Sequence, residues 1–327
     1  MYITPILMCH HIGIEMESFC DGNGMRLRRE LQCNTQADLF IPYLSDLPLR
    51  DQRETMERPF FSLSKRKRVT PIEYQSPDGS VWVKVEAVPA YGMATIWDAD
   101  ILIWAASTLV EMRERGVMEL PRTLRFHPYN LLKAIQRDVG GDQYKRLKEA
   151  LERLKGTIIS TNIRGDTKTR RAMFGWLDDW SEEVDETSQQ TKEMSITLSN
   201  WIYKGIIMQG GVLAVHPDYF LLTGGLERCL YRIARKHAGM QTHGWTCTVA
   251  TLYEKTGSES NSKEFNRMLR KIVNSDTLPE YHLHWIDQTE SGESAVHIIR
   301  RSVLPSSHPE FRYATTKSKI RPLISQD

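Results

Sequence analysis

The feature that most constrains the fold is an order of parts that occurs twice along the 327-residue chain. In each copy a long apolar helix is followed by two further helices and then by two strands with a polar turn between them. Corresponding parts are offset by about 120 residues, and little sequence identity survives between the copies. Because each set of parts must bury its own apolar faces, the sequence predicts two similar folding units.

The first copy has three predicted helices, over residues 95–116, 129–139 and 142–155. Residue types that favour helix ends stand at the boundaries of these segments. They are Thr95 with Asp98, Pro128, Gly140 and Asp142. Residues 157–164 alternate as a strand does, and residues 174–177 are predicted to return beside them as the second strand of a hairpin.

The second copy repeats this order. A helix is predicted to begin near residue 217 or 226 and to end at 238, and two more cover 248–256 and 261–274. Asn261 and Glu264 resemble a capping box, and strands over 281–286 and 295–300 flank a turn. Helix, helix–turn–helix and hairpin is the order of a winged helix. The sequence therefore predicts an α+β, mostly helical fold of two tandem winged-helix domains, each a helix-turn-helix plus a β-hairpin wing, with an N-terminal extension.

These units set the expected domain boundaries. Residues 58–212 are predicted to form the first winged-helix domain and residues 213–304 the second. Residues 1–57 show little periodicity, which predicts a poorly ordered N-terminal leader. Residues 305–327 are predicted to form a basic C-terminal tail.

Charge is distributed unevenly, although the net charge is only +2. Residues 122–171 hold thirteen Lys and Arg against five Asp and Glu, and residues 227–271 hold nine against four. Residues 178–193, between them, hold seven acids and one Lys. Local fields matter more for binding than the sum, so two basic regions favour a nucleic-acid partner despite the low net charge.

The helix over 261–274 divides into two unlike faces. One side is apolar at helical spacing, through Phe265, Met268, Leu269 and Ile272. The opposite side carries cations and amides, which are predicted to read DNA bases: Lys263, Asn266, Arg267, Arg270 and Asn274. Arg can read guanine through two donors, and Asn can read adenine through a donor and an acceptor. Lys271, at the edge of this arc, is predicted to contact the DNA backbone.

The helix over 142–155 has a similar but less selective outer face. It lacks amides in the outward arc, and Glu149 interrupts the positive charge. Contact with phosphates is therefore expected, extended by a polar tip at 165–171 that would act as a wing. The residues predicted to contact the backbone here are Lys145, Arg146, Lys148, Arg153, Lys168, Arg170 and Arg171. Charged faces are also common on solvated helices that bind nothing, but two of them in matching units favour DNA.

Four segments resemble the RepA-type replication initiators of plasmids. They begin at Arg58 (RPFFSL), Gly92 (GMATIWDADILIWAAS), Asp142 (DQYKRLK) and Tyr219 (YFLLTGGLERCLYRIARKHAG). The resemblance covers roughly residues 58–302. These segments are mostly core and scaffold sequence, so they identify a family more directly than they identify atoms that contact DNA.

The resemblance implies a plasmid replication initiator that binds repeated sequences (iterons) of double-stranded origin DNA. Such proteins help to open an adjacent AT-rich duplex and to recruit host initiator and replicative helicase. The second winged helix of similar proteins reads the major groove, whereas the first contacts the backbone and mediates dimerisation. Dimers of this kind restrain copy number. The expected location is the bacterial cytoplasm, with no membrane partner, no cofactor and no enzymatic activity.

Two alternatives stay open. A metal-dependent rolling-circle nickase would hold its metal between His282 and His284 and attack DNA with a tyrosine such as Tyr313. The His282-Leu283-His284 triplet lies in the predicted wing, and this position favours structural or solvated histidines over metal ligands. A winged-helix transcription regulator would share the DNA-binding chemistry without a replication role. No Gly-Lys-Ser/Thr phosphate loop is present, so ATP-driven melting by this chain is not expected.

Overall fold

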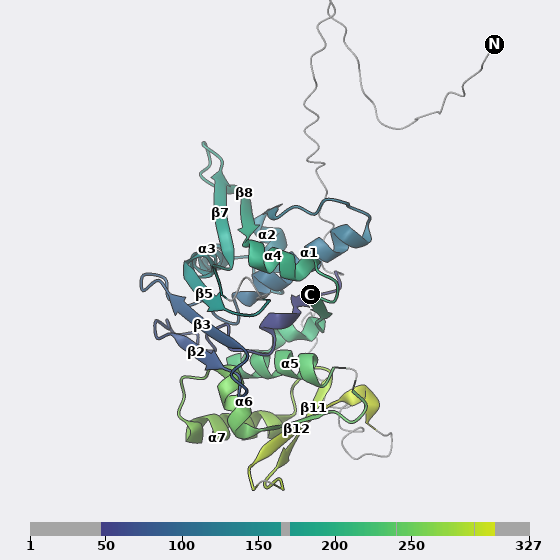
Figure 1. Cartoon of the computed structure of the whole chain (residues 1–327). Helices are drawn as coiled ribbons and strands as arrows, with labels where there is room; N and C mark the ends of the chain where they lie inside the picture. Colours follow the sequence, from purple (N-terminus) through teal and green to yellow (C-terminus); the bar gives the residue numbers. More distant parts are fainter. Residues whose placement is uncertain (1–46, 165–170, 240, 291, 305–327) are drawn as a thin grey trace, which may run out of the picture. The chain divides into compact units, whose positions relative to one another are not determined.

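Both predicted copies of the helix and hairpin order are present in a computed structural model, which describes residues 47–164, 171–239, 241–290 and 292–304 (Figure 1). The first copy consists of α1 (Ala99–Glu114), α2 (Pro128–Ala134), α3 (Gly141–Gly156), β5 (Thr157–Thr161) and β6 (Ala172–Phe174). The second consists of α5 (Gly225–His237), α6 (Val249–Thr256), α7 (Ser262–Ser275), β11 (Tyr281–Ile286) and β12 (Ala295–Arg300). By their contacts, the described residues belong to one unit.

Short antiparallel sheets accompany these helices. The remaining elements are β1 (Arg50–Gln52), β2 (Ile72–Gln75), β3 (Trp82–Ala87), β4 (Thr123–Phe126), β7 (Leu177–Val184), β8 (Thr191–Leu198), α4 (Asn200–Ile207), β9 (Val212–Ala214) and β10 (Trp245–Thr248). In the described residues the strand orders are β2-β3-β5-β6, β4-β8-β7, β10-β12-β11 and β1-β9. The α+β class is confirmed. The many strands in the described residues do not support the description "mostly helical".

Each hairpin is completed by strands from elsewhere in the chain. β11 and β12 pair from Tyr281 opposite Arg300 to Ile286 opposite Ala295, and β10 adds to the other edge of β12. β5 pairs with β6 and also with β3, so the first hairpin belongs to a four-stranded sheet. The predicted return strand over 174–177 is wrong in detail, because β6 ends at Phe174 and β7 begins at Leu177.

Local chemistry explains most helix boundaries. The backbone N–H of Thr95 donates to Asp98 Oδ2 at 2.8 Å, and that of Asp98 donates to Thr95 Oγ1 at 3.4 Å, which is the predicted reciprocal cap before α1. Pro128 is the first residue of α2, as predicted. The second helix is shorter than predicted, because Gln136 adopts a left-handed conformation with φ 55°.

Two further boundaries differ from the prediction. Gly140 is the residue before α3 and does not close α2, and Asp142 lies inside the first turn of α3. The predicted helix that would begin near 217 or 226 consists of a 3-10 helix over Pro217–Leu221 and, separately, of α5. Residues 222–224 separate these two helices, because Leu222 and Gly224 adopt extended conformations.

Buried ion pairs fasten α5 to α1 of the first copy and to β1. Arg228 Nη1 lies 2.7 Å from Asp100 Oδ1 of α1, and Arg232 Nε lies 2.8 Å from Asp51 Oδ2 of β1. All four side chains are at most 4% exposed. Breaking a buried pair leaves one uncompensated charge, so these contacts hold α5 in one position against α1 and β1. Among the helices that the structure describes, none has the length and apolarity needed to cross a bilayer.

Candidate nucleic-acid interface

Helix α7 is fixed at both ends. Asn261 Oδ1 accepts from the backbone N–H of Glu264 at 2.9 Å, which caps the first turn. The predicted reciprocal bond from Glu264 is absent, since both of its carboxylate oxygens accept from Arg267. At the other end Asp276 adopts a left-handed conformation, with φ 47°, and its N–H donates to Ile272 O at 3.0 Å. The helix therefore ends sharply beside the hairpin.

The outer face of α7 is open to solvent. Phe265, Leu269 and Ile272 are buried on the inner side, as the helical spacing predicts. The five residues predicted to read bases are exposed, as is Lys271: Lys263, Asn266, Arg267, Arg270 and Asn274. The structure therefore brings the predicted set together on one face.

Two of these cations are oriented by neighbouring groups. Arg267 donates to Glu264 at 2.8 and 2.6 Å, and this hydrogen bond lowers the pKa of Glu264. The guanidinium of Arg270 lies 3.8 Å from the ring centroid of Trp285 on β11, and its Nη2 lies 3.2 Å from Asp287 Oδ1. Exposed pairs of this kind contribute about 0–1 kcal/mol, so a stronger anion can replace the carboxylate.

The end of α7 is bound to the hairpin through Asp276. Its Oδ1 lies 3.1 Å from Nδ1 of the buried His282 on β11, and its Oδ2 lies 2.8 Å from Arg301 Nη1. His282 thus has a structural contact, whereas His284 is exposed. Within the described ranges no group of three His, Cys, Asp or Glu is placed to hold a metal ion, and Tyr313 lies outside those ranges.

The outer face of α3 is less available than its sequence suggests. Lys145 and Arg146 are exposed, and neither pairs with a carboxylate in the described part of the chain. Arg153 is partly buried and donates through Nε and Nη2 to both oxygens of Asp98, at 2.8 and 2.9 Å. This hydrogen bond is the main reason that the pKa of Arg153 is raised. Arg153 therefore supports the start of α1 and is not displayed outward.

An acidic hairpin, residues 177–198 of β7 and β8, covers one side of α3 (Figure 1). Lys148 Nζ lies 2.7 Å from Glu182 Oε2, and Lys155 donates to the carbonyl of Asp178. Of the seven acids noted in the sequence, Glu182 therefore pairs with a cation of α3, and Asp178 contacts the same helix through its backbone. The sequence predicted that the cations of α3 face solvent, and the packing of this hairpin explains why Lys148 is only partly exposed.

The predicted first wing is only partly described. Lys168 and Arg170 lie outside the described residues. Arg171 is exposed, and its guanidinium lies 5.9 Å from the ring centroid of Trp82 on β3.

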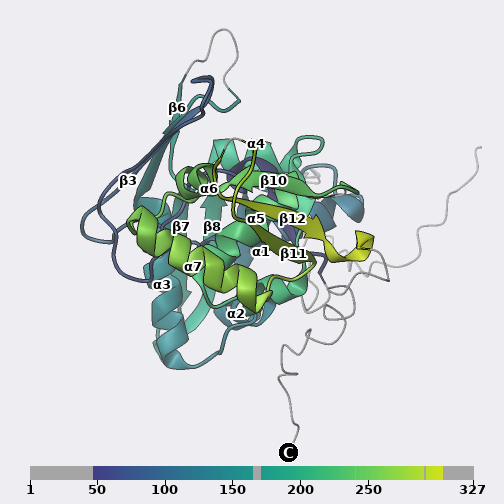
Figure 2. The same ribbon diagram turned by 90° about the horizontal axis from the view of Figure 1, so that it is seen from below.

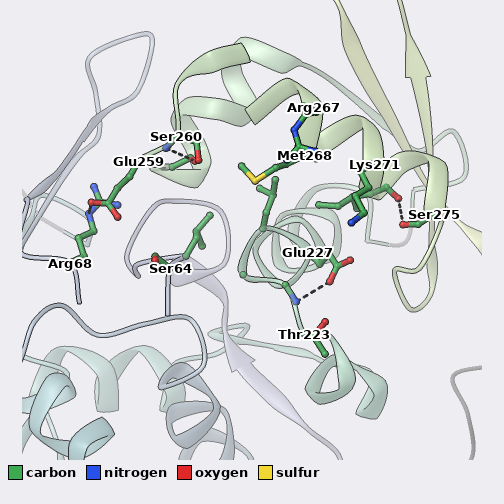
Figure 3. A pocket seen from close by; sticks show the side chains of 16 residues that line it. Ser64, Arg68, Thr223, Glu227, Glu259, Ser260, Arg267, Met268, Lys271 and Ser275 are labelled. Atoms are coloured by element: carbon green, nitrogen blue, oxygen red, sulfur yellow. Dashed lines mark hydrogen bonds and ion pairs between the residues drawn. The ribbon is translucent and has the colours of Figure 1, made fainter. Parts of the chain in front are cut away.

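A hollow of about 680 Å³ lies beside α7 (Figure 3). Arg267 and Lys271 of α7 line one side, and Glu227 at the start of α5 lies opposite. Ser64 and Arg68 also line this hollow. The site predicted from the sequence did not include these residues. The run of basic residues at 65–68 was the available signal, but periodicity cannot show that it approaches a helix 200 residues away.

Cationic helix faces followed by hairpins are typical of proteins that bind duplex DNA. Comparison with known families is more specific. Residues 50–283 match the family model "Replication initiator protein A", and the chain belongs to that family. The resemblance found in the sequence is therefore confirmed, and the family supports a replication initiator role.

Individual relatives agree with this assignment. A "Putative replication protein" of Wigglesworthia glossinidia brevipalpis is 33% identical over 239 residues, which cover 72% of this chain and 84% of the relative. A crystal structure of domains 2 and 3 of RctB matches with a TM-score of 0.53 at 12% identity, over 76% of this chain and 96% of the RctB chain. A second structure of RctB domains 2–3 matches with a TM-score of 0.49 at 11% identity. The first structural match shows a similar fold.

Proposed function

We propose that this protein initiates plasmid replication by binding iteron repeats of a double-stranded origin through two winged-helix domains, residues 58–212 and 213–304. The observation that carries the proposal is the outer face of α7. Five cations and amides are exposed there in one arc, on a helix that packs against α6 and against β11 of the hairpin. That arrangement suits insertion into a major groove.

The chemistry of α7 favours base readout. Its arc combines Arg267 and Arg270 with Asn266 and Asn274, so guanine and adenine can both be recognised. Lys263 adds a further donor at the start of the helix, where side chains of recognition helices usually reach base edges. Each good bidentate contact discriminates against the wrong base by about 1–3 kcal/mol.

We assign backbone contacts to the first domain and to the edge of α7. Lys145, Arg146 and Lys271 are the strongest candidates, because they are exposed and unpaired with carboxylates among the described residues. Lys148 and Arg153 are weaker candidates, since Glu182 and Asp98 already hold them. Lys168, Arg170 and Arg171 complete the proposed set as a wing.

Opening of the duplex would use binding energy. The sequence has no phosphate loop for ATP, so we propose that bound copies bend the origin and destabilise its AT-rich segment. Host initiator and replicative helicase would then be recruited, and dimerisation through the first domain would restrain copy number. These steps would take place in the bacterial cytoplasm.

The first test measures the sequence specificity of DNA binding. The full chain is titrated by fluorescence anisotropy against a duplex of its own plasmid's origin repeats and against a shuffled duplex of the same composition. Specific proteins of this kind bind their site about 10³–10⁷ times more tightly than other DNA. Equal affinity for the two duplexes would refute sequence-specific binding.

A second measurement separates an initiator from a transcription regulator. The origin fragment is placed on a plasmid that has no other origin, and this gene is supplied in trans. An initiator supports replication of that plasmid, whereas a regulator that binds the same repeats does not.

A further inference from the structure

A basic loop, residues 64–68, lies between the two helices that carry the proposed interface. On one side Ser64 and Arg68 line the hollow beside α7, together with Arg267 and Lys271 (Figure 3). On the other side residues 65–67 line a second hollow, of about 670 Å³, whose α3 lining is Gln143, Arg146, Glu149 and Arg153. The loop thus borders both helices, and both views show α3 and α7 on the same side of the described residues (Figure 1, Figure 2).

Both ends of the basic loop are anchored in the fold. Before it, the N–H of Ser62 donates to Ala94 O at 3.0 Å, and Ser62 O accepts from Ile96 at 2.9 Å. The last residue of the loop, Arg68, is 8% exposed and donates to Thr70 O at 3.0 Å and to Gly257 O at 2.7 Å. Arg68 thus fixes the loop to the end of α6 rather than projecting outward.

The three cations between these anchors point outward. Lys65, Arg66 and Lys67 are all exposed. Lys65 Nζ lies 5.0 Å from the ring centroid of Trp97, and Lys67 Nζ donates to Ala90 O at 2.6 Å. In the described ranges none of the three forms an ion pair with a carboxylate, which leaves three adjacent like charges uncompensated.

Gly92 allows the loop to take this path. Its φ is +82°, and a Cβ at this position would lie 2.7 Å from Lys67 Cγ. Three uncompensated cations on an anchored loop repel one another, and a polyanion in contact with all three would relieve that repulsion. The spacing of phosphates along duplex DNA supplies such a partner.

We propose that the basic loop is a third contact with the DNA backbone, which binds phosphates of the duplex between the segments contacted by α3 and α7. The proposal rests on the proposed DNA-binding function and adds Lys65, Arg66 and Lys67 to its site. It predicts one continuous cationic track from Arg146 through the loop to Lys271. Contacts of this type position a protein on DNA and carry no base preference.

The test removes the three charges from the full chain. Lys65→Gln, Arg66→Gln and Lys67→Gln are combined, and affinity for the origin and shuffled duplexes is measured between 50 and 300 mM salt. The slope of log K against log salt is negative, and each lost phosphate contact makes it shallower by about 0.9. The magnitude of the slope should therefore decrease by about 2 to 3 on both duplexes. The ratio of the two affinities stays unchanged.

A matched control removes three exposed cations that line neither hollow. Arg113→Gln, Lys192→Gln and Lys204→Gln change the net charge equally and leave the salt slope as in the parent. Circular dichroism checks that both triple variants fold. If the loop variant does not fold, Arg66→Gln alone is used, since its guanidinium has no hydrogen bond or ion pair within the described residues, and the magnitude of the slope should fall by about 0.9.

Three outcomes overturn the proposal: a parental slope in the loop variant, an equal loss in the control, or a loss confined to origin DNA. Failure of the proposed function gives a different result. If the parent binds the origin and shuffled duplexes equally, specific readout fails, but the loop is still tested by its slope on either duplex.

Discussion

Helices α3 and α7 occupy the same place in the two copies, yet their cations have different surroundings. Those of α7 are exposed, and the carboxylates that contact them, Glu264 and Asp287, are themselves exposed. On α3, Lys148 pairs with the acidic hairpin and Arg153 with the buried Asp98, and Lys145 and Arg146 are exposed. The cations of a basic helix therefore stay available to DNA where they are unpaired or where their carboxylate partners are exposed, and they are held back where the partner is buried.

The largest effect that sharpens this comparison is expected at Arg153. Arg153→Ala leaves the carboxylate of Asp98, which is 3% exposed, without its partner. Loss of one partner of a buried pair typically costs 3–5 kcal/mol, and the partial exposure of Arg153 favours about 3 kcal/mol. Urea unfolding measures this loss, and the salt dependence of DNA binding should change less than in Arg146→Ala, because Asp98 already holds Arg153.

Arg146→Ala is the matched control for Arg153. Arg146 is exposed and unpaired in the described residues, so stability should change by no more than about 0.5 kcal/mol. The slope of log K against log salt should become shallower by about 0.9, because one phosphate contact is removed. Equal unfolding midpoints for Arg153→Ala and the parent would show that Arg153 is not structural, and the two helices would then be alike.

The second effect concerns base readout by α7. Arg270→Ala removes a guanidinium that Trp285 orients from β11. Affinity for the origin should fall by about 1–3 kcal/mol with a relaxed preference at one base position, while binding to shuffled DNA changes little. Anisotropy titrations against a set of single-base variants of one repeat measure both effects, and Arg267→Ala should behave in the same way at another position.

Arg115→Ala serves as the control for Arg270→Ala. Arg115 is likewise exposed and paired with one carboxylate, Glu111, but it lies at the end of α1, outside the proposed interface. If Arg270→Ala and Arg267→Ala both discriminate origin from shuffled DNA as well as Arg115→Ala does, α7 does not read the sequence.

Sequence periodicity was sufficient for α7 because local spacing determines both of its faces. Phe265 and Leu269 are buried and Asn266 and Arg270 are exposed, as the 3.6-residue period requires. The bounds of β11 and β12 were also predicted, since alternation and a polar turn identify them locally. Features of the fold that depend on residues close together in the sequence could therefore be predicted.

The same method failed where the partner is distant in the sequence. Arg153 and Asp98 are 55 residues apart, and no local pattern links them. The acidic segment was recognised by composition, but its packing on α3 could not be. The basic loop approaches α7 only through the tertiary fold, so its position between the two helices required coordinates.

The smallest effect tests whether the acidic hairpin limits α3. Burial raises the pKa of Glu182, but hydrogen bonds from Lys148 and Thr191 outweigh it and hold the pKa below its usual range. The carboxylate is therefore charged at neutral pH and competes with phosphate for Lys148. Glu182→Gln should release Lys148 and steepen the salt slope by at most about 0.9, with equal gains on origin and shuffled DNA.

Glu186→Gln removes the same charge from the turn of that hairpin, where no cation pairs with it among the described residues. Glu186 contacts no cation in the described ranges, and salt screens exposed charges over about 10 Å, so its removal should alter binding much less than that of Glu182 does. Equal gains from the two substitutions would mean that the hairpin acts through its total charge. A gain at Glu182 alone would mean that one ion pair determines how much of α3 is available to DNA.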